Sequence, residues 1–383
     1  MTELDNMLAT LSGEHPSRFP YCPMGHWNRR ACKKLLPPEC FDDNIYSLPH
    51  ERFDSFPRRP ESRMAAVNYA RFMGLSTLGC GKGGPMPFGH GGPGEIIGWL
   101  EKRQAGNEIY RFEGGSTRLV RYDPYSVQYG HSFPILEPED LERLELPDPT
   151  DPARWVDIEP DSASFTGAGI MPAGKIMGFF SGIHNNFYDF QKLMINLIDN
   201  PGFVHRLTAR LAEWSLAAAE EMLKRGVCMI EVCDDLGTPE GMLISPAMFT
   251  EFFLPWYRKL FELCHSYHSY VHMHSHGNIA AIIPLLLDAG VDILNPFDPK
   301  ENRNLEELVE RFSDRVVFCG FIPSDYYLLQ KDEEIEILFR RAASLGRKCK
   351  RGYIIMEHGF PEELSVERFR FILGLVDKYR KTD

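Results

Sequence analysis

The second half of the sequence repeats one pattern, in which a short apolar run is followed by a longer amphipathic run. The short runs have the length of buried β-strands, and the longer runs have helical periodicity. Six strand–helix units in succession predict a parallel sheet that is covered by helices. The expected strands are residues 175–183, 227–233, 270–275, 291–295, 316–320 and 353–356. The expected helices are residues 186–223, interrupted at Asn200-Pro201-Gly202, then 245–268, 279–289, 305–312, 333–345 and 366–379.

Two weaker units precede these six. Residues 19–24, followed by an amphipathic run at 27–36, have the pattern of a first strand, and residues 72–78 have that of a second. Eight units fit a closed (β/α)8 barrel, so the predicted fold class is α/β, with a single TIM-barrel domain over residues 1–383. A doubly wound open sheet is the alternative.

Two segments fall outside the repeated pattern. Residues 1–17 precede the first expected strand and would form an N-terminal extension. Residues of about 105–135 alternate polar and apolar side chains around Gly114-Gly115, which predicts an antiparallel hairpin or meander inserted into the barrel.

Charge and composition narrow the function classes. The formal net charge of -12 argues against non-specific binding to nucleic acid. No apolar run approaches the roughly 20 residues that span a bilayer, and the acidic first residues do not resemble a secretion signal. The nine cysteines form no C-x-x-C pair and are expected to be reduced thiols. We therefore expect a cytoplasmic protein that acts on a small molecule, with neither nucleic acid nor membrane as a partner.

Three histidines recur at every second position in Val271-His272-Met273-His274-Ser275-His276. Alternate side chains of a strand share one face, so these imidazoles would point the same way. Imidazole is a common ligand of zinc. We predict that His274 and His276, at the end of the strand, bind a metal ion; hydrogen bonding to substrate or a structural role are the alternatives. His272 lies one layer deeper, as a core residue or a substrate contact.

Polar residues also stand at the ends of other expected strands, and the active site of a (β/α)8 barrel lies at the C-terminal ends of its strands. A catalytic zinc usually has three protein ligands and one open position. We expect His358 to be the third ligand, with Glu357 or Glu231 as alternatives. The expected substrate-binding residues are Glu231, Asn295, His26, His272 and Glu357.

Two adjacent carboxylates, Asp234 and Asp235, follow the fourth expected strand. In a regular strand the side chains of adjacent residues point to opposite faces, so only one of the two carboxylates would point into the barrel. We predict that Asp235 or Asp234 acts as a general base or orients the substrate, and a solvated loop pair is the alternative.

The glycine-dense segment at residues 79–94 does not satisfy G-x-x-x-x-G-K-[ST]. We expect it to be a flap over the barrel mouth rather than a phosphate site.

The sequence from about residue 174 to 379 resembles the uroporphyrinogen decarboxylase superfamily, which implies a (β/α)8 barrel. The order and spacing of several motifs carry this resemblance over more than half of the chain. These motifs are Asp234-Asp235-Leu236-Gly237, Ile244-Ser245-Pro246-Ala247-Met248-Phe249, His274-Ser275-His276-Gly277-Asn278-Ile279, Gly290-Val291-Asp292-Ile293-Leu294-Asn295-Pro296 and His358-Gly359.

The superfamily contains two chemistries. The chain lacks the arginine-rich segment after the first strand and the aspartate after the second that typify the decarboxylases. The cobamide-dependent methyltransferases carry zinc on a His-x-Cys pair and a later Cys. The resemblance places His274, His276 and His358 at those positions, so imidazoles replace both thiolates and leave the ion with its full charge, as a stronger Lewis acid.

The function that we predict is a zinc-dependent methyltransferase of corrinoid-linked one-carbon metabolism. It would move a methyl group between a small substrate and a corrinoid carried by a partner protein. A decarboxylase or lyase acting on a smaller carboxylated substrate is the first alternative. A non-catalytic barrel that binds a ligand is the second.

Overall fold

The protein is described here from a computed structural model. The residues that it describes are 1–23, 34–40, 60–81, 98–104, 107–112, 114–121, 127–329, 331–357 and 363–382. Two predicted site residues, His26 and His358, and the glycine-dense segment beyond residue 81 lie outside them.

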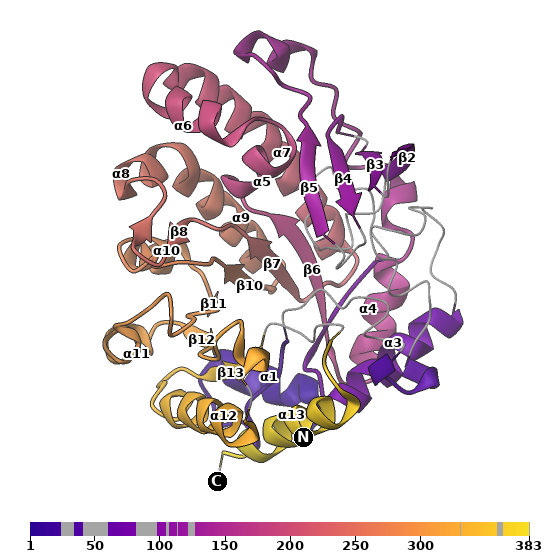
Figure 1. Ribbon diagram of the computed structural model, residues 1–383, viewed down its shortest axis with the longest axis vertical. Helices are drawn as coiled ribbons and strands as arrows, with labels where there is room; N and C mark the ends of the chain where they lie inside the picture. Colours follow the sequence, from indigo (N-terminus) through magenta and orange to yellow (C-terminus); the bar gives the residue numbers. More distant parts are fainter. Residues whose placement is uncertain are drawn as a thin grey trace.

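Seven parallel strands form one curled sheet with helices on its outer face (Figure 1). Their order in the sheet follows their order in the chain, as successive strand–helix units require. The strands are β1 (Thr77–Gly79), β6 (Met171–Met177), β7 (Met229–Cys233), β10 (Tyr270–His274), β11 (Ile293–Asn295), β12 (Val317–Gly320) and β13 (Tyr353–Ile355).

A short segment at residues 20–22 lies between the two edges of this sheet. Ile355 of β13 donates its backbone N–H to Pro20 (2.9 Å) and accepts from Cys22 (3.0 Å). On the other side, the N–H of Ser76, directly before β1, donates to the carbonyl of Tyr21 (2.9 Å). The segment expected to be the first strand is therefore hydrogen-bonded to the edge strand β13 on one side and to the residue before the edge strand β1 on the other.

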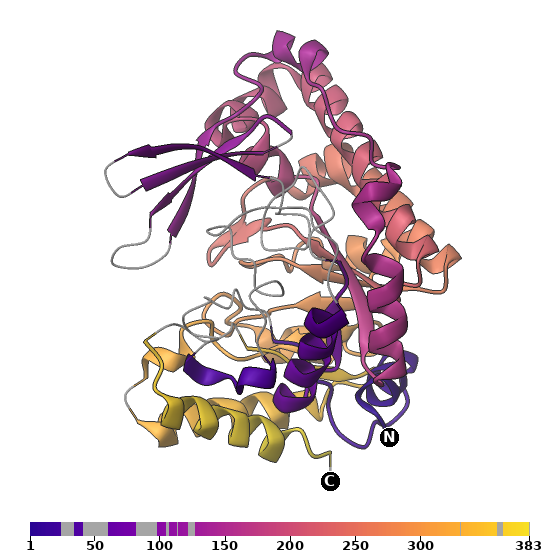
Figure 2. The ribbon, with the colours of Figure 1, turned by 90° about the vertical axis from the view of Figure 1, so that its right-hand side faces the viewer.

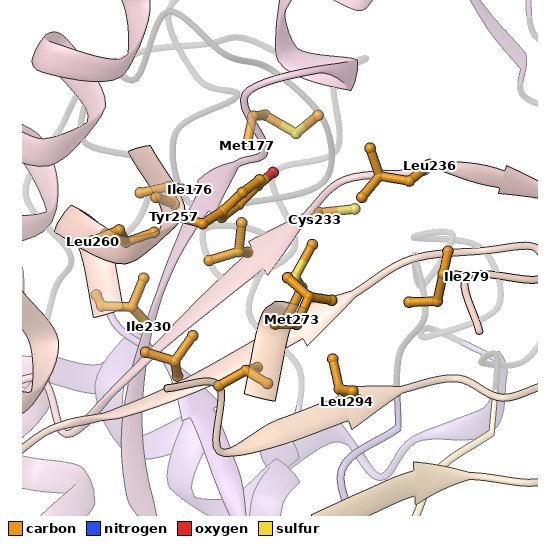
Figure 3. Close-up of a cluster of buried hydrophobic side chains, with 14 of the residues drawn as sticks. Ile176, Met177, Ile230, Cys233, Leu236, Tyr257, Leu260, Met273, Ile279 and Leu294 are labelled. Carbon is orange, nitrogen blue, oxygen red and sulfur yellow. The ribbon is translucent and has the colours of Figure 1, made fainter. Parts of the chain in front are cut away.

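Helices follow the strands and bury their apolar faces on the sheet. Figure 3 shows this contact, where Ile230, Met273 and Leu294 from three strands meet Tyr257 and Leu260 from the helix α9. All five side chains are almost completely buried. The helices longer than eight residues are α1 (Glu3–Ser12), α3 (Pro60–Met73), α4 (Ile158–Gly167), α6 (Phe190–Asp199), α7 (Pro201–Lys224), α9 (Leu254–Ser266), α12 (Asp332–Gly346) and α13 (Val366–Tyr379). The shorter ones are α5 (Ser181–Asn186), α8 (Pro246–Met248), α10 (Ile283–Ala289) and α11 (Leu305–Phe312).

Some elements differ from their expected bounds. Pro255 was expected to kink or divide the helix at residues 245–268, and a π-helical turn at Phe249–Phe253 does lie directly before this proline, which lacks the N–H that a continuous helix needs. The strand expected at 175–183 instead spans Met171–Met177, and the helix α5 begins at Ser181. The strand expected at 72–78 is short, because α3 runs to Met73.

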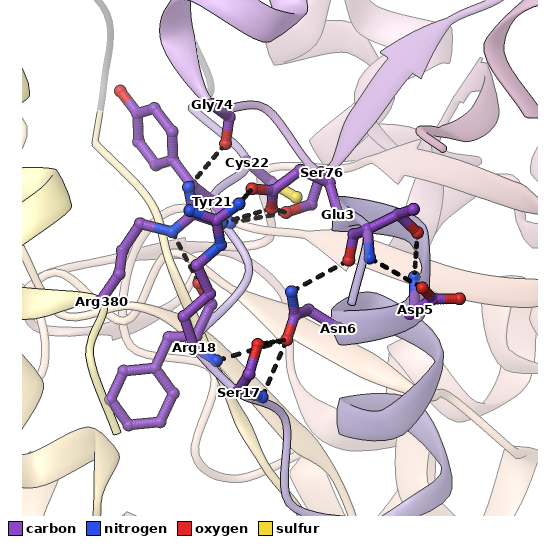
Figure 4. A network of polar contacts seen from close by, with 12 residues as sticks. Glu3, Asp5, Asn6, Ser17, Arg18, Tyr21, Cys22, Gly74, Ser76 and Arg380 are labelled. Atoms are coloured by element: carbon purple, nitrogen blue, oxygen red, sulfur yellow. Dashed lines mark hydrogen bonds and ion pairs between the residues drawn. The ribbon is translucent and has the colours of Figure 1, made fainter. Parts of the chain in front are cut away.

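The N-terminal helix α1 covers the N-terminal end of the sheet. Met7 and Leu11 are buried against interior residues of the strands, such as Ala173 and Met229. Beside them, the carboxylate of Glu3 pairs with the buried guanidinium of Arg380 (Figure 4). The extension is thus an integral part of the core rather than a separate tail.

Four strands form a separate antiparallel sheet: β2 (Gly98–Gln104), β3 (Asn107–Phe112), β4 (Thr117–Arg121) and β5 (Val127–Ser132). Figure 2 shows this sheet standing apart from the parallel strands. Of the hairpin and the meander that we expected, the structure has a four-stranded meander, and it begins before residue 105. It is joined to α5 through Arg118, whose guanidinium donates to the side chain of Asn186 (2.8 Å).

No helix among the described residues is both long and apolar enough to cross a lipid bilayer.

Candidate active site

Polar side chains from neighbouring strands line a small cavity inside the curled sheet. The strand register pairs His272 with Glu231, and Glu231 with Lys175, so these three side chains form one layer. His274 pairs with Asn295 in the layer above. The cavity has a volume of about 40 Å³. Its lining comprises Cys22, Pro23, Lys175, Glu231, Val232, Cys233, His272, His274 and Asn295.

Two of the three alternating histidines face this cavity. His272 and His274 are only 5% and 6% exposed. Burial, helped by the nearby His274, lowers the pKa of His272 to about 3, and burial also lowers the pKa of His274. Among the described residues, the Nδ1 atoms of both rings have no hydrogen-bond partner. Both imidazoles are therefore neutral near pH 7, the form that binds a metal ion.

His276 lies beyond the end of β10, beside His274. The two ring centroids are 4.9 Å apart and the rings are nearly perpendicular. Nδ1 of His276 lies 3.0 and 3.2 Å from the two carboxylate oxygens of Glu301, which also accepts the N–H of Gly277 (2.8 Å). Burial opposes protonation of His276, but the hydrogen bond to Glu301 and its charge raise the pKa above its ordinary value. A histidine held in this way through Nδ1 presents Nε2 to a ligand.

The two adjacent aspartates have different surroundings. The carboxylate of Asp234 is completely buried and accepts hydrogen bonds from the N–H of Phe180 (3.2 Å), the N–H of Ser181 (2.6 Å), the hydroxyl of Ser181 (2.7 Å) and the hydroxyl of Tyr257. Burial raises the pKa of Asp234, although these hydrogen bonds oppose the shift. Its oxygens are occupied in fixing the start of α5.

Asp235 points toward the histidines, and its side chain is 44% exposed. One carboxylate oxygen lies 3.5 Å from Nε2 of His274 and accepts the backbone N–H of His276 (2.9 Å). Burial alone would raise its pKa, but the hydrogen bonds and charge interactions with His274 and His276 together hold the pKa well below its usual value. Of the two aspartates, Asp235 is the one that contacts the predicted metal ligands.

The loops that carry these groups meet at two glycines. A Cβ atom on Gly277 would lie 2.1 Å from the carbonyl carbon of Gly237, and Gly277 has a φ of +86°. Only glycine satisfies both the conformation and the close approach. The Asp-Asp-Leu-Gly and His-Ser-His-Gly motifs of the sequence thus meet in one contact.

The remaining predicted site residues are placed as follows. Asn295 lines the cavity, and its Nδ2 lies 2.8 Å from Sδ of Met356. Glu357 is buried and accepts hydrogen bonds from the hydroxyls of Tyr21 (2.8 Å) and Tyr326 (3.2 Å). His26 and His358 lie outside the described residues, so their positions stay predictions.

Sequence reasoning missed three residues near the site. Lys175 is the one charged residue within the apolar run that forms the end of β6, and this contrast could have identified it. Glu301 comes from the loop after β11, and no local motif marks it. His184 of α5 packs between Phe180 and Phe190, and burial lowers its pKa to about 4.

The described residues alone contain no group of three His, Cys, Asp or Glu side chains that could hold a metal ion. The pair of His274 and His276 nevertheless has features that suit metal ligands. His274 is buried with a ring nitrogen that has no partner within the described part, and His276 has the carboxylate support that is typical of zinc-binding histidines.

The chain is similar to several known proteins. A methyltransferase from Methanosarcina mazei matches with a TM-score of 0.63 at 16% identity, covering 99% of each chain. A B12-independent methionine synthase from a Shewanella species matches with a TM-score of 0.49 at 12% identity, covering 95% of this chain and 97% of that one. No curated protein sequence matches the chain. The family model described as uroporphyrinogen decarboxylase (URO-D) matches residues 130–379. The chain therefore belongs to the uroporphyrinogen decarboxylase (URO-D) family.

Proposed function

We propose that this protein is a zinc-dependent methyltransferase built on a closed (β/α)8 barrel, in which residues 20–22 serve as the first strand. It would transfer a methyl group between a small substrate and a corrinoid on a partner protein. The observation that carries this proposal is the pair His274 and His276 at the end of β10, one with an orphaned ring nitrogen and the other supported by Glu301. Family membership and the fold shared with a methyltransferase support it.

In this proposal His274, His276 and His358 hold the zinc ion. The bound ion would act as a Lewis acid that polarises the atom bearing the methyl group. Glu301 fixes the orientation of His276 through Nδ1, and Asp235 lies beside His274, where it would orient the substrate or accept a proton.

The other residues of the site have supporting roles. We assign Asp234 a structural role, because each of its bonds is made to the start of α5 or to α9. Glu231, His272 and Asn295 would contact the substrate, since they line the cavity beneath His274. Glu357 would hold the end of β13 in place through its two tyrosine partners.

Metal analysis tests the proposal directly. We expect the purified protein to hold about one zinc ion per chain and the His274→Ala variant to lose it. The control is His205→Ala on α7, which removes a histidine that is about half exposed and whose ring lies beside Glu251 and Phe252 rather than beside the candidate ligands. A zinc content that is equal in the two variants would contradict the proposal.

Methyl exchange with methylcobalamin separates the first function from its alternatives. With the small substrate present as methyl acceptor, a methyltransferase would consume methylcobalamin in a reaction that depends on His274. A decarboxylase or lyase would release carbon dioxide from its substrate without a corrinoid. A ligand-binding barrel would neither consume methylcobalamin nor release carbon dioxide.

A further inference from the structure

Two segments of the chain each carry charge of almost one sign. Residues 137–151 contain seven carboxylates and a single basic side chain, that of Arg143, so their net charge is -6. Residues 340–351 contain six basic side chains and no carboxylate, so their net charge is +6. A protein with a net charge of -12 therefore has one concentrated acidic segment and one concentrated basic segment.

The acidic segment lies along α6 and α7. Nζ of Lys192 in α6 donates to the carbonyl of Leu136 (2.6 Å) and to the carboxylate of Glu137 (2.7 Å). The indole N–H of Trp214 in α7 donates to the carbonyl of Pro147 (2.6 Å). These bonds hold the segment on the surface of the two helices.

Most carboxylates of the acidic segment face solvent without a positive partner. Glu137 pairs with Lys192, and Asp140 lies 3.3 Å from Arg143. Within the described part of the chain, the exposed carboxylates of this segment that form no ion pair are Glu139, Glu142, Glu145, Asp148 and Asp151. The segment therefore presents uncompensated negative charge to solvent.

The basic segment covers the C-terminal part of α12 and the loop before β13. Arg341 pairs with Glu306 (3.1 Å), and Arg351 lies 3.9 Å from Asp292. The exposed cations of the segment that form no ion pair with any described residue are Arg340, Arg347, Lys348 and Lys350. The carboxylates at residues 332–336 stand at the other end of α12. The loop before β13 therefore presents uncompensated positive charge to solvent.

The two segments lie far from each other in the molecule. Figure 1 shows the connection after β5, which contains the acidic segment, at the upper end of the longest axis and α12 at the lower end. Figure 2, turned about the same axis, shows the same separation. The opposite charges cannot meet within one chain, but they can meet between two copies of it.

Exposed apolar side chains accompany the charges at both ends. Leu136, directly before the acidic segment, is 60% exposed, and Ile198 of the neighbouring helix α6 is 69% exposed. At the other end Ile337 of α12 is 48% exposed, and it shares one side of the helix with Arg340 and Arg341, three and four residues later. Apolar side chains bordered by charged ones are typical of protein–protein interfaces.

We propose that the protein associates with a second copy of itself from head to tail, with the acidic segment of one copy on the basic segment of the next. The two surfaces differ, so the contact is heterologous, and a dimer keeps one free end of each sign to which further copies can add. Exposed ion pairs contribute little individually and are screened by salt, so the association is weak and depends on ionic strength. The inference is independent of the chemistry proposed for the cavity.

Sedimentation velocity of the complete chain tests the association. A concentration series is recorded at about 0.1 M and at about 1 M salt, between which the screening length falls from about 10 Å to about 3 Å. We expect the sedimentation coefficient to rise with protein concentration at the lower salt concentration and to stay at the monomer value at the higher one.

Charge reversal at each end locates the contact. Lys348→Glu combined with Lys350→Glu reverses the basic end, and Glu139→Lys combined with Glu142→Lys reverses the acidic end. Each double variant alone should associate at least about tenfold more weakly than the wild type, because like charges then face each other. An equal mixture of the two should associate again, because each variant retains the end that the other has lost.

The matched control is Arg258→Glu combined with Lys259→Glu on α9. It changes the net charge by the same amount at two exposed residues outside both segments, so it should associate like the wild type. Three outcomes would overturn the inference. They are a sedimentation coefficient that does not depend on concentration at the lower salt concentration, a mixture that stays monomeric, and a control that dissociates as readily as the variant with a reversed basic end.

Discussion

The surroundings of Asp234 predict that this residue is needed for stability rather than for chemistry. Its carboxylate accepts two backbone N–H groups, from Phe180 and Ser181, and two hydroxyls, from Ser181 and Tyr257. The hydroxyls can turn toward other acceptors, since that of Ser181 already lies 3.4 Å from the carbonyl of Cys233. The two backbone groups are fixed by the start of α5 and have no such freedom.

This difference sets the expected magnitude. Asp234→Ala leaves two buried N–H groups without an acceptor, at about 1–3 kcal/mol each, so it should cost about 2–6 kcal/mol. Asp234→Asn keeps the shape and one accepting oxygen, so one of the two backbone N–H groups loses its acceptor. This loss should cost about 1–3 kcal/mol. The control Asp235→Asn makes the same chemical change one residue later. It should cost under about 1 kcal/mol, because the amide oxygen can still accept the N–H of His276.

Urea unfolding, followed by both circular dichroism and tryptophan fluorescence, provides the measurement. Coincident transitions are required before a midpoint is converted into a free energy. We expect the Asp234 variants to lose stability and the Asp235 variant to lose methyl transfer. An Asp234→Asn protein that is as stable as the wild type but inactive would refute this reasoning.

Three further outcomes are expected. Glu301→Gln should weaken zinc binding by about 10- to 100-fold, measured by competition with a chelator, because Glu301 orients His276; unchanged affinity would contradict this. The pKa of His184 is lowered from 6.5 to about 4, so between these two pH values the folded state binds fewer protons than the unfolded state. Stability is therefore lost as the pH falls from 6.5 to about 4. His184→Phe should reduce that loss, by at most about 3 kcal/mol, in unfolding curves recorded at about pH 4 and pH 7; an identical loss would contradict the assignment. Leu11→Ala, in the helix that covers the end of the sheet, should cost about 2–5 kcal/mol of unfolding free energy. Leu8→Ala in the same helix removes a side chain that is 40% exposed, and its cost should stay within about 0.5 kcal/mol.

The later strand–helix units could be predicted from the sequence because their patterns are local. The helices expected at 305–312 and 366–379 have the observed bounds, and the expected strand at 270–275 differs from β10 by one residue. Their apolar periodicity and flanking turn residues determine them without reference to the rest of the chain.

Elements that depend on distant contacts were placed less well. The apolar run Met177-Gly178-Phe179-Phe180 has the pattern of a continuing strand, but Asp234, more than fifty residues later, binds the backbone at Phe180 and Ser181 and starts a helix there. The helix α1 was missed as an element, although Thr2 and Asp5 form a capping box and Gly13 ends the helix.

The candidate site shows the same division. The alternating histidines could be identified from their spacing, because a strand places every second residue on one face. Glu301 and the pairing of Lys175 with Glu231 depend on which strands and loops become neighbours. That information lies in the sheet register and in no single motif.

The central claim is that imidazoles from two distant segments surround one metal ion above the cavity. A crystal of the as-purified protein, with diffraction recorded on both sides of the zinc absorption edge, tests it most directly. The account predicts one anomalous peak within bonding distance of His274, His276 and His358, at about 2.0–2.1 Å from a nitrogen of each ring. An anomalous map without a peak there, or with His358 turned away from the other two, would contradict the account.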